Sequence, residues 1–305
     1  MGTRVEECRF QGEPGLRLVA GELAATFLPG VGMTGVSLRY GSDEHLAVPG
    51  GVPALRAGAT AGLPLLAPWA NRLSSPRYRV GRIHVDLREY RVPTDSLGLP
   101  IHGLLVGQPG WRVETCRVRG KRAILHASID VDAPAFPFPH RIDVAATALE
   151  DRVDLRTTLV PTGRRRVPAA FGWHPYLRLP GASRSRWTLR LPSRRHLALD
   201  ARGIPTGFAR HEDAEAAPIR RRTFDDLYAL GSDRRLSLET DAGSAIVVRC
   251  GTGYEYAQVW VPERRPYAAL EPMVASTNAL VEGTAPLVPP GDSFAAGVTL
   301  AVRPH

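Results

Sequence analysis

The sequence predicts an all-β protein built as a sandwich or a barrel. Apolar and polar residues alternate with a period of two over many short segments, as in strands that bury one face. Between these segments lie 30 glycines and 27 prolines, which is too many for a helical protein. No segment carries a sustained apolar stripe at the helical period of 3.6 residues. Repeated short strands separated by turn signals are typical of sandwiches and barrels.

The strands are expected in the following order. A glycine-rich connection at 29–32 joins segments 23–28 and 33–40, and alternation returns over 125–131, 142–147 and 153–159, with a turn at Glu150-Asp151. Long irregular stretches are expected at 48–66 and 200–223, the second with a helical turn near 211–215. Later strands are expected at residues 187–191, 236–240, 245–250, 256–261, 267–271 and 293–302.

Length and composition indicate a globular protein with a sizeable core. The chain has 305 residues, of which 44% are hydrophobic and 23% charged. We find no internal repeat or linker and expect a single domain spanning residues 1–305. No apolar stretch reaches membrane-spanning length, and the first residues contain no apolar signal region, so we expect a cytoplasmic protein. Three widely spaced cysteines suggest neither a disulfide framework nor a metal site.

The net charge of +9 comes almost entirely from arginine, because Lys121 is the single lysine. The arginines are spread along the chain apart from two triplets, 164–166 and 220–222, which we expect to lie on solvated loops. This distribution does not favour nucleic-acid binding. A basic surface can still attract anionic ligands, so a phosphorylated substrate stays open.

A histidine between aromatic residues is the centre of residues 171–180. His174 ends the apolar run 167–173, and Pro175 after it cannot take part in ordinary strand pairing. We therefore expect the imidazole at a sheet edge or cavity mouth rather than deep in a core. Taken alone, such a histidine is more often structural than functional.

Glu271 is the best catalytic candidate on chemical grounds. It interrupts an apolar run, which is costly unless the carboxylate is paired, hydrated or functional. Pro272 is expected to end this strand, as Pro175 does after His174.

Two further stretches could bind sugar hydroxyls. Asn71 and Arg72 follow Trp69; the arginine fork donates to hydroxyls, and an indole can cover the apolar face of a sugar ring. The alternative is a surface arginine packed on Trp69, and this stretch alone favours it. His102 precedes Gly103, which allows close approach of a ligand or of backbone, but alone it is more readily a structural histidine.

Paired acids between aromatic residues form the last candidate. Asp225 and Asp226 lie between Phe224 and Tyr228, where a carboxylate could accept hydrogen bonds from a sugar. A capping or turn aspartate is the alternative, and in isolation it is favoured.

The glycine spacing of residues 30–35 fits a dinucleotide-binding loop. That motif requires a following helix, and here an alternating segment follows. The stretch is therefore interpreted as a glycine-rich strand connection.

Together these stretches resemble the aldose 1-epimerase (mutarotase) family. The resemblance runs over nearly the whole chain, and its motifs, each weak alone, occur in the family's order. They are the glycine-rich strand pair near 28–38, Ala70-Asn71-Arg72-Leu73, Ile101-His102-Gly103, Trp111, Phe171-Gly172-Trp173-His174-Pro175-Tyr176, Phe224-Asp225-Asp226, Leu270-Glu271-Pro272-Met273 and Ser276-Thr277-Asn278-Ala279-Leu280.

The resemblance implies a large antiparallel β-sandwich with a sugar bound in an open cleft. It also implies that Glu271 is the general base and His174 the general acid, while Arg72, His102 and Asp225 hold hydroxyls or assist at the ring oxygen, with Asn71 beside them. Such a reaction opens the ring by moving one proton off the C1 hydroxyl and another onto the ring oxygen. Ordinary pKa values of about 4.3 for glutamate and about 6.5 for histidine nearly give these states, and a modestly raised histidine pKa would complete them. No cofactor or metal is expected.

Some residues depart from the family pattern. Many members have Phe-Asn-Leu where this chain has Leu177-Arg178-Leu179, and glycine where it has Leu104. Arg178 could favour an anionic sugar or point to solvent. The leading hypothesis is an epimerase of a free hexose, and the alternatives are a hexose-6-phosphate 1-epimerase and a non-catalytic carbohydrate-binding or regulatory protein of the same fold. We expect a small sugar as partner, and no nucleic acid or membrane; the sugar and the oligomeric state stay open.

Overall fold

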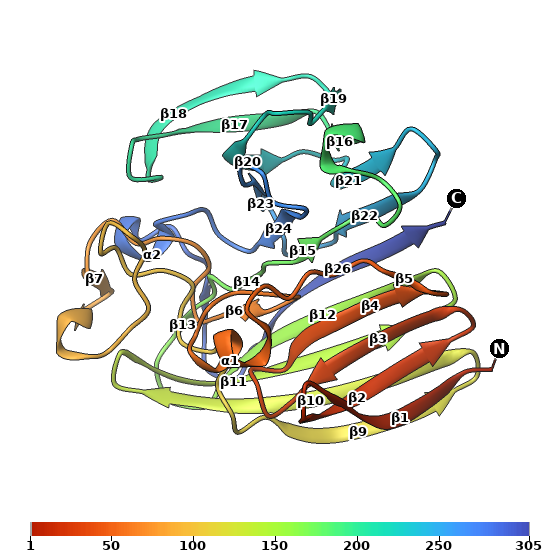
Figure 1. Ribbon diagram of the computed structural model, residues 1–305. Coiled ribbons are helices and arrows are strands. Elements are labelled where there is room, and N and C mark those ends of the chain that lie inside the picture. The colour runs from red at the N-terminus through yellow and green to blue at the C-terminus, as the bar shows by residue number, and fades with distance from the viewer. Residues whose placement is uncertain (1, 305) are drawn as a thin grey trace.

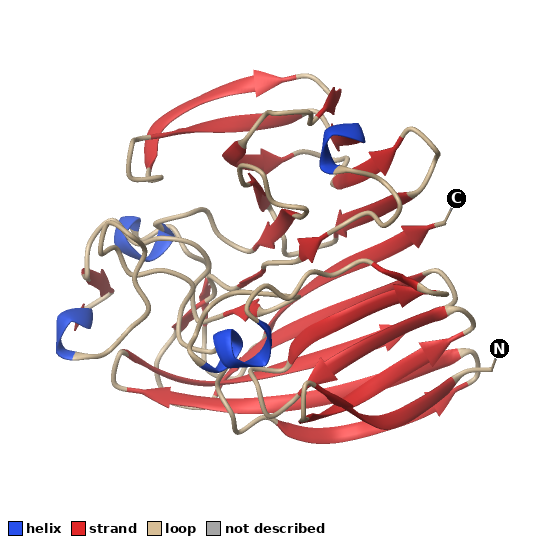
Figure 2. Cartoon of the chain, viewed as in Figure 1, coloured by secondary structure: helices blue, strands red, loops and turns tan. Residues whose placement is uncertain are grey.

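The computed structural model describes residues 2–304, and almost all of its regular structure is antiparallel sheet (Figures 1 and 2). Three large sheets pack together, and both short turns and long loops connect their strands. The all-β prediction is therefore confirmed, in its sandwich form rather than as a barrel.

The nine-stranded sheet forms the long layer that runs across Figure 1. Its centre is a meander, β10–β11–β12, in which each strand pairs with the next along the chain. The C-terminal strand then joins the meander to the later hairpins. In spatial order the strands are β19 (Glu215–Pro218), β16 (Trp187–Leu191), β21 (Arg235–Thr240), β22 (Ala245–Cys250), β26 (Phe294–Arg303), β12 (Arg152–Pro161), β11 (Phe136–Ala148), β10 (Arg122–Ala133) and β9 (Arg112–Arg119).

The N-terminal sheet has five strands in simple sequence order and lies beside the meander (Figure 1). The glycine-rich connection predicted at 29–32 joins its third and fourth strands. These strands are β1 (Arg4–Phe10), β2 (Glu13–Ala20), β3 (Leu23–Leu28), β4 (Thr34–Tyr40) and β5 (Asp43–Glu44).

The third sheet carries the candidate catalytic residues. Its order is β18-β17-β20-β23-β24-β14-β6, and β15 also pairs with β24. The strands are β18 (Pro205–Glu212), β17 (Arg194–Leu199), β20 (Phe224–Leu230), β23 (Tyr256–Val261), β24 (Ala268–Met273), β14 (Gly172–Trp173), β15 (Tyr176–Leu177) and β6 (Leu65–Leu66).

The remaining elements are short. Two small antiparallel pairs are β7 (Arg77–Val80) with β8 (Ile83–Asp86) and β13 (Val167–Pro168) with β25 (Leu287–Val288). The helices are α1 (Gly51–Arg56) and α2 (Ala279–Glu282), with single 3₁₀ turns η1 (Leu87–Glu89) and η2 (Arg184–Arg186). Within the described residues, no helix combines the length and apolar character needed to cross a membrane.

The core lies between the layers, and the alternation of the sequence creates it. Along β11, every second side chain is buried, from Phe136 through Ile142 to Ala148. The buried faces of the meander, of the N-terminal sheet and of the third sheet belong to one apolar cluster. Burying each large side chain contributes about 1.5–3 kcal/mol, so this cluster supplies the main driving force for stacking the sheets.

One buried hydrogen bond links two of the layers. Trp173 on β14 donates from Nε1 to Oγ1 of Thr157 on β12 at 3.1 Å, and both residues are buried. The indole therefore fixes the start of the His174 segment against the nine-stranded sheet.

Two strand predictions differ from the structure. The strand of Glu271 does not end at Pro272 but continues to Met273. Proline is tolerated there because β14 and β15 pair with β24 only at Met273 and at residues 268–269, so neither pairs with Pro272 itself.

The stretch 200–223 was expected to be irregular with a helical turn, and it instead contains β18 and β19. Strand β18 is the edge of its sheet and is mostly exposed on both faces. A strand solvated on both faces shows no apolar alternation, so its sequence contains no period-two signal.

Replacing Thr157 by Val tests the bond between the layers. We expect Thr157→Val to lower the free energy of unfolding by about 1–3 kcal/mol, because the Trp173 Nε1–H stays buried without an acceptor. Urea unfolding followed by tryptophan fluorescence measures this. The half-buried neighbour Thr158 provides the control, and an equal effect of Thr158→Val would contradict the assignment.

Candidate active site

His174 and Glu271 meet in the third sheet. His174 Nε2 lies 3.2 Å from Glu271 Oε1, and the side chains are only 6% and 2% exposed. An imidazole and a carboxylate at this distance are within reach of proton transfer. The two candidates that the sequence ranked highest, almost a hundred residues apart, are therefore neighbours.

The strand pairing explains how the two residues meet. Gly172 pairs with Met273 and Tyr176 pairs with Ala269, so His174 lies between two short strands that flank the same segment of β24. The backbone N–H of His174 donates to Pro64 O at 3.1 Å. A Cβ at Gly172 would lie 2.7 Å from Pro272 O, so only glycine permits this approach of the strands.

The expectation that Pro175 would leave the imidazole at an edge or cavity mouth is wrong. The proline does interrupt the strand, but β15 begins directly after it and returns to β24. His174 is therefore enclosed, with 5% of its surface exposed.

Burial controls the charge of this pair. It lowers the pKa of His174 to about 3. It also raises the pKa of Glu271 well above its usual value; Asp225 adds to this rise, and Arg72 opposes it. The modestly raised histidine pKa expected from the chemistry is thus wrong in direction, because loss of hydration penalises the imidazolium. The site favours neutral imidazole beside protonated carboxyl.

Three side chains share one face of the sheet with Glu271. Gln258 pairs with Glu271, and Trp260 pairs with Asp225 on the next strand. Because directly opposed residues point to the same face, all four line one surface. Gln258 Nε2 donates to Asp225 Oδ1 at 2.6 Å. The Asp225 side chain is 48% exposed and that of Glu271 only 2%, so the site opens to solvent at Asp225.

Arg72 is held over this surface by acceptors on several sides. Its Nε donates to Asp95 Oδ2 at 2.9 Å, and its Nη2 lies 3.7 Å from Asp225 Oδ2. Asn71 Oδ1 accepts from the Arg72 backbone at 2.8 Å and from its Nη1 at 3.3 Å. Asn71 is itself buried, so its oxygen orients the arginine.

His102 approaches the pair from a different loop. Its ring meets that of His174 edge-on, with centroids 5.5 Å apart, and its backbone N–H donates to Asn71 O at 3.1 Å. Burial holds the pKa of His102 well below its usual value, with His174 and Arg72 acting in the same direction. His102 and Asn71 both have positive φ, 63° and 57°, which is uncommon for residues with a side chain and clusters at functional sites.

Aromatic rings form a wall behind the histidine. Tyr176 stacks on His174 with centroids 4.7 Å apart and an interplanar angle of 20°. Trp260 meets both rings edge-on at 5.6 Å, and Tyr267 lies 5.2 Å from Tyr176. The Tyr176 hydroxyl lies 2.6 Å from Thr60 Oγ1, which fixes the stack.

Several polar atoms at the centre have no partner within the described residues. They are His174 Nδ1, His102 Nδ1, Glu271 Oε2 and Gln258 Oε1, all buried. Buried polar atoms are nearly always hydrogen-bonded, so four unpaired atoms in one place indicate a site built for a polar ligand. Among residues 2–304, no group of three or more His, Cys, Asp or Glu side chains has the arrangement of a metal site.

Sequence reasoning identified six of these residues and missed others. Gln258 and Trp260 lie in the predicted strand 256–261, but their position beside Glu271 and Asp225 depends on register, which one sequence does not encode. Asp95 lies in a loop and reaches Arg72 only through tertiary folding. Tyr176 belongs to the histidine motif and was not assigned a role. Arg178, singled out beside the histidine, is exposed.

Fold and site together define an all-β sandwich protein with a buried imidazole–carboxylate pair beside an aromatic wall. The chain belongs to the aldose 1-epimerase family, whose sequence model matches residues 55–298. None of the curated protein sequences matches it.

Solved structures show the same fold over the full length. A galactose mutarotase-like protein from Clostridium acetobutylicum aligns with a TM-score of 0.89 at 17% identity, covering 100% of this chain and 99% of the other. An aldose epimerase homologue from C. elegans aligns with a TM-score of 0.74 at 15% identity, covering 99% of each chain. Galactose 1-epimerase from Lactobacillus acidophilus NCFM aligns with a TM-score of 0.75 at 12% identity, covering 99% and 98%.

The raised pKa of Glu271 predicts that this residue lowers the stability of the folded protein at high pH. Above the ordinary pKa of glutamate, the Glu271 carboxyl loses its proton in the unfolded chain. In the folded site the carboxyl either keeps its proton or carries a buried charge. The free energy of unfolding therefore falls as pH rises. We expect Glu271→Gln to gain on the order of 1 kcal/mol at pH 8, and the gain to vanish near pH 4.

Thermal unfolding at the two pH values measures this difference. Glu150→Gln is the matched control, because the Glu150 side chain is 64% exposed. A pH-independent effect of Glu271→Gln would contradict the prediction.

Proposed function

We propose that the protein is an aldose 1-epimerase that interconverts the α and β anomers of a free hexose such as glucose or galactose. The observation that carries this proposal is the 3.2 Å approach of His174 Nε2 to Glu271 Oε1 in a buried site. Moving a proton off one sugar oxygen and onto another needs two such groups within reach of one ring.

The surrounding side chains suit a pyranose. Arg72, His102 and Asp225 offer donors and acceptors for hydroxyl groups, and Asn71 orients Arg72. Gln258 has a buried oxygen free to accept. Trp260 offers an apolar surface beside Asp225 for the carbon face of the ring.

In the proposed ring opening, Glu271 as carboxylate removes the proton of the C1 hydroxyl, and His174 as imidazolium gives its Nε2 proton to the ring oxygen. The bond from C1 to the ring oxygen breaks, and the C1–O1 bond becomes a carbonyl. After rotation about C1–C2, the ring oxygen attacks the other carbonyl face, its proton returns to His174, and Glu271 returns its proton to O1.

Burial of the pair favours proton transfer in the direction of ring opening. The ionised pair and the neutral pair hold the same number of protons, and ring opening converts the first into the second. Because burial favours neutral imidazole and protonated carboxyl, it favours the state that accompanies the open-chain sugar. Arg72 opposes this bias at Glu271 and so helps the carboxylate to form.

Two observations bear on the alternatives. The guanidinium in the site, Arg72, already contacts the carboxylates of Asp95 and Asp225, which supports a neutral hexose over a sugar with its phosphate at this position. A carbohydrate-binding protein without activity needs no acid–base pair in contact, so the His174–Glu271 distance supports an enzyme.

Removing either member of the pair should abolish most of the activity. We expect Glu271→Gln and His174→Asn each to lower kcat by about 10²–10⁴-fold. Polarimetry of freshly dissolved α-glucose and α-galactose measures the rate. Glu150→Gln is the control for loss of a carboxylate, and wild-type rates in Glu271→Gln would disprove the mechanism.

The pH profile of kcat/KM should lack the acid limb that a histidine with an ordinary pKa of about 6.5 would give. The pair gains a second proton only when His174 is protonated, and the pKa of His174 is lowered to about 3. We therefore expect kcat/KM to fall on the acid side near pH 3 and to be nearly unchanged between about pH 6 and pH 5. Buffered polarimetry across this range measures it; an acid limb centred near pH 6.5 would contradict the expectation.

A further inference from the structure

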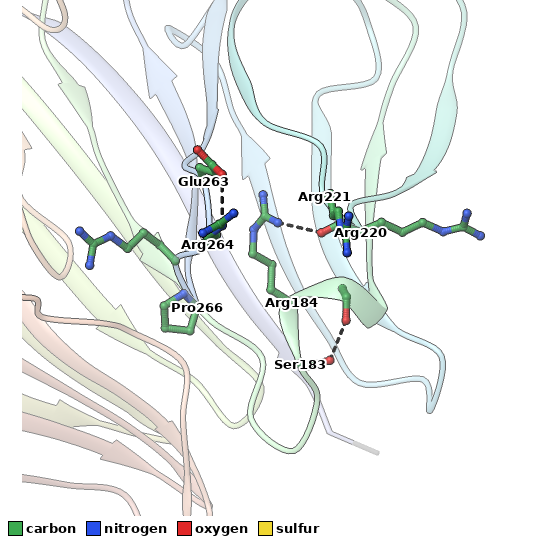
Figure 3. A pocket seen from close by; sticks show the side chains of 9 residues that line it. Ser183, Arg184, Arg220, Arg221, Glu263, Arg264 and Pro266 are labelled. Atoms are coloured by element: carbon green, nitrogen blue, oxygen red, sulfur yellow. Dashed lines mark hydrogen bonds and ion pairs between the residues drawn. The ribbon is translucent and has the colours of Figure 1, made fainter.

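A second hollow, rich in arginine, lies beyond the strand ends of the third sheet. It encloses 610 Å³ and is lined by residues of three connections: 183–185 after β15, 220–221 before β20, and 263–266 between β23 and β24. Figure 3 shows Arg184 between the loop of Arg220 and Arg221 and the loop of Glu263 to Pro266. Segments far apart in sequence thus converge here.

The lining is strongly cationic. Five arginines contribute to it, namely Arg184, Arg220, Arg221, Arg264 and Arg265. Among the described lining residues, the single acid is Glu263, which lies 3.2 Å from Arg264. Placing several positive charges close together in a hollow is electrostatically unfavourable unless an anion offsets them.

Arg184 makes two hydrogen bonds to backbone carbonyls of a neighbouring loop. It donates to the backbone carbonyls of Arg220 at 2.8 Å and Arg222 at 2.5 Å, so it has acceptors without a neutralising charge. Its Nε is buried and has no partner among the described residues. In contrast, Arg186 on the same 3₁₀ turn contacts the carboxylate of Asp241 at 2.5 Å.

The backbone of two lining arginines is also unusual. Arg220 and Arg264 have φ of 46° and 53°, in the left-handed region that side-chain-bearing residues rarely adopt. In this chain Asn71 and His102, at the candidate active site, show the same feature. Arg220 and Arg264 both lie in turns, so the surrounding structure holds the backbone of these two lining residues in a defined conformation.

The chemistry of the lining indicates the ligand. Guanidinium groups present planar forks of N–H donors that match the oxygens of a phosphoryl group, often in bidentate fashion. A hollow lined by several arginines suits a doubly or more highly charged anion better than a single carboxylate.

The hollow lies outside the space of the sugar ring. Glu271 is three residues, ~10 Å, from the start of β24 at Ala268, and the loop of 263–266 lies beyond that start. Tyr267 stands between this loop and the strand, and its ring faces Tyr176 of the aromatic wall. A group in the hollow is therefore separate from the atoms that react.

We propose that this arginine-lined hollow is a binding site for a phosphoryl group, carried either by a free phosphate or pyrophosphate anion or by a phosphorylated small molecule. Residues 220–222 lie in an exposed loop, as expected from the sequence, and Arg220 and Arg221 of this loop also line the hollow. The site is independent of the epimerase proposal.

Calorimetric titration with inorganic phosphate and with pyrophosphate tests the site directly. We expect saturable binding, tighter for pyrophosphate and weaker at higher salt concentration. Replacing Arg221 and Arg265 together by Gln should weaken it at least about tenfold, since each loses charge-assisted hydrogen bonds. These two side chains make no hydrogen bond or ion pair within the described residues, so the variant should fold; Arg184→Gln is a second variant.

Arg186→Gln is the matched control, because it removes one positive charge from the same turn outside the hollow. Absence of saturable binding to the wild-type protein, or equal weakening by Arg186→Gln, would overturn the proposal.

Titration with glucose 6-phosphate then distinguishes the source of the phosphoryl group. If a phosphorylated small molecule carries it, glucose 6-phosphate binds, and the Arg221→Gln/Arg265→Gln variant weakens that binding. If a free anion carries it, only phosphate and pyrophosphate bind. Since calorimetry needs no catalytic activity, failure of this site and failure of the epimerase proposal give different results.

Discussion

The contact between His174 and Glu271 places two ionisable groups where water does not hydrate them. Much of the surrounding structure serves this contact. The interruption of the strand at Pro175 directs His174 toward β24, Gly172 lets the strands approach, and the Trp173–Thr157 bond anchors the segment to the second layer. Desolvation then decides the protonation of the pair, because the packing leaves no solvent to stabilise either charge.

The aromatic and the polar residues around the pair have different roles. Tyr176 and Trp260 exclude water and fix the imidazole plane, whereas Arg72, Asp225 and Gln258 form a polar rim that is increasingly exposed toward Asp225. The chain holds Asn71 and His102 in left-handed conformations to complete this rim. Backbone strain at these positions is tolerated because the enclosing sheets are extensively packed.

Much of the fold was predictable from the sequence, because strands with one buried face have an alternating pattern. The segments 187–191, 245–250 and 256–261 were predicted at their observed bounds. Edge strand β18 was missed since solvent on both sides removes the pattern. Glu271 was identifiable because it interrupts an apolar run, and His174 because it ends one within a motif that resembles the aldose 1-epimerase family. Their pKa directions were not predictable, since burial depends on the layers around them. The arginine hollow was also unpredictable, because three distant loops form it.

A glycine lies close in sequence to each of the two histidines of the site. A Cβ at Gly103, beside His102, would lie 2.2 Å from Ala67 O, and one at Gly172 would lie 2.7 Å from Pro272 O. Close contact of main chain with main chain therefore contributes to the spacing of the two imidazoles. In protein engineering, a change of an exposed rim side chain such as Asp225 therefore leaves the backbone contacts that hold the histidines intact.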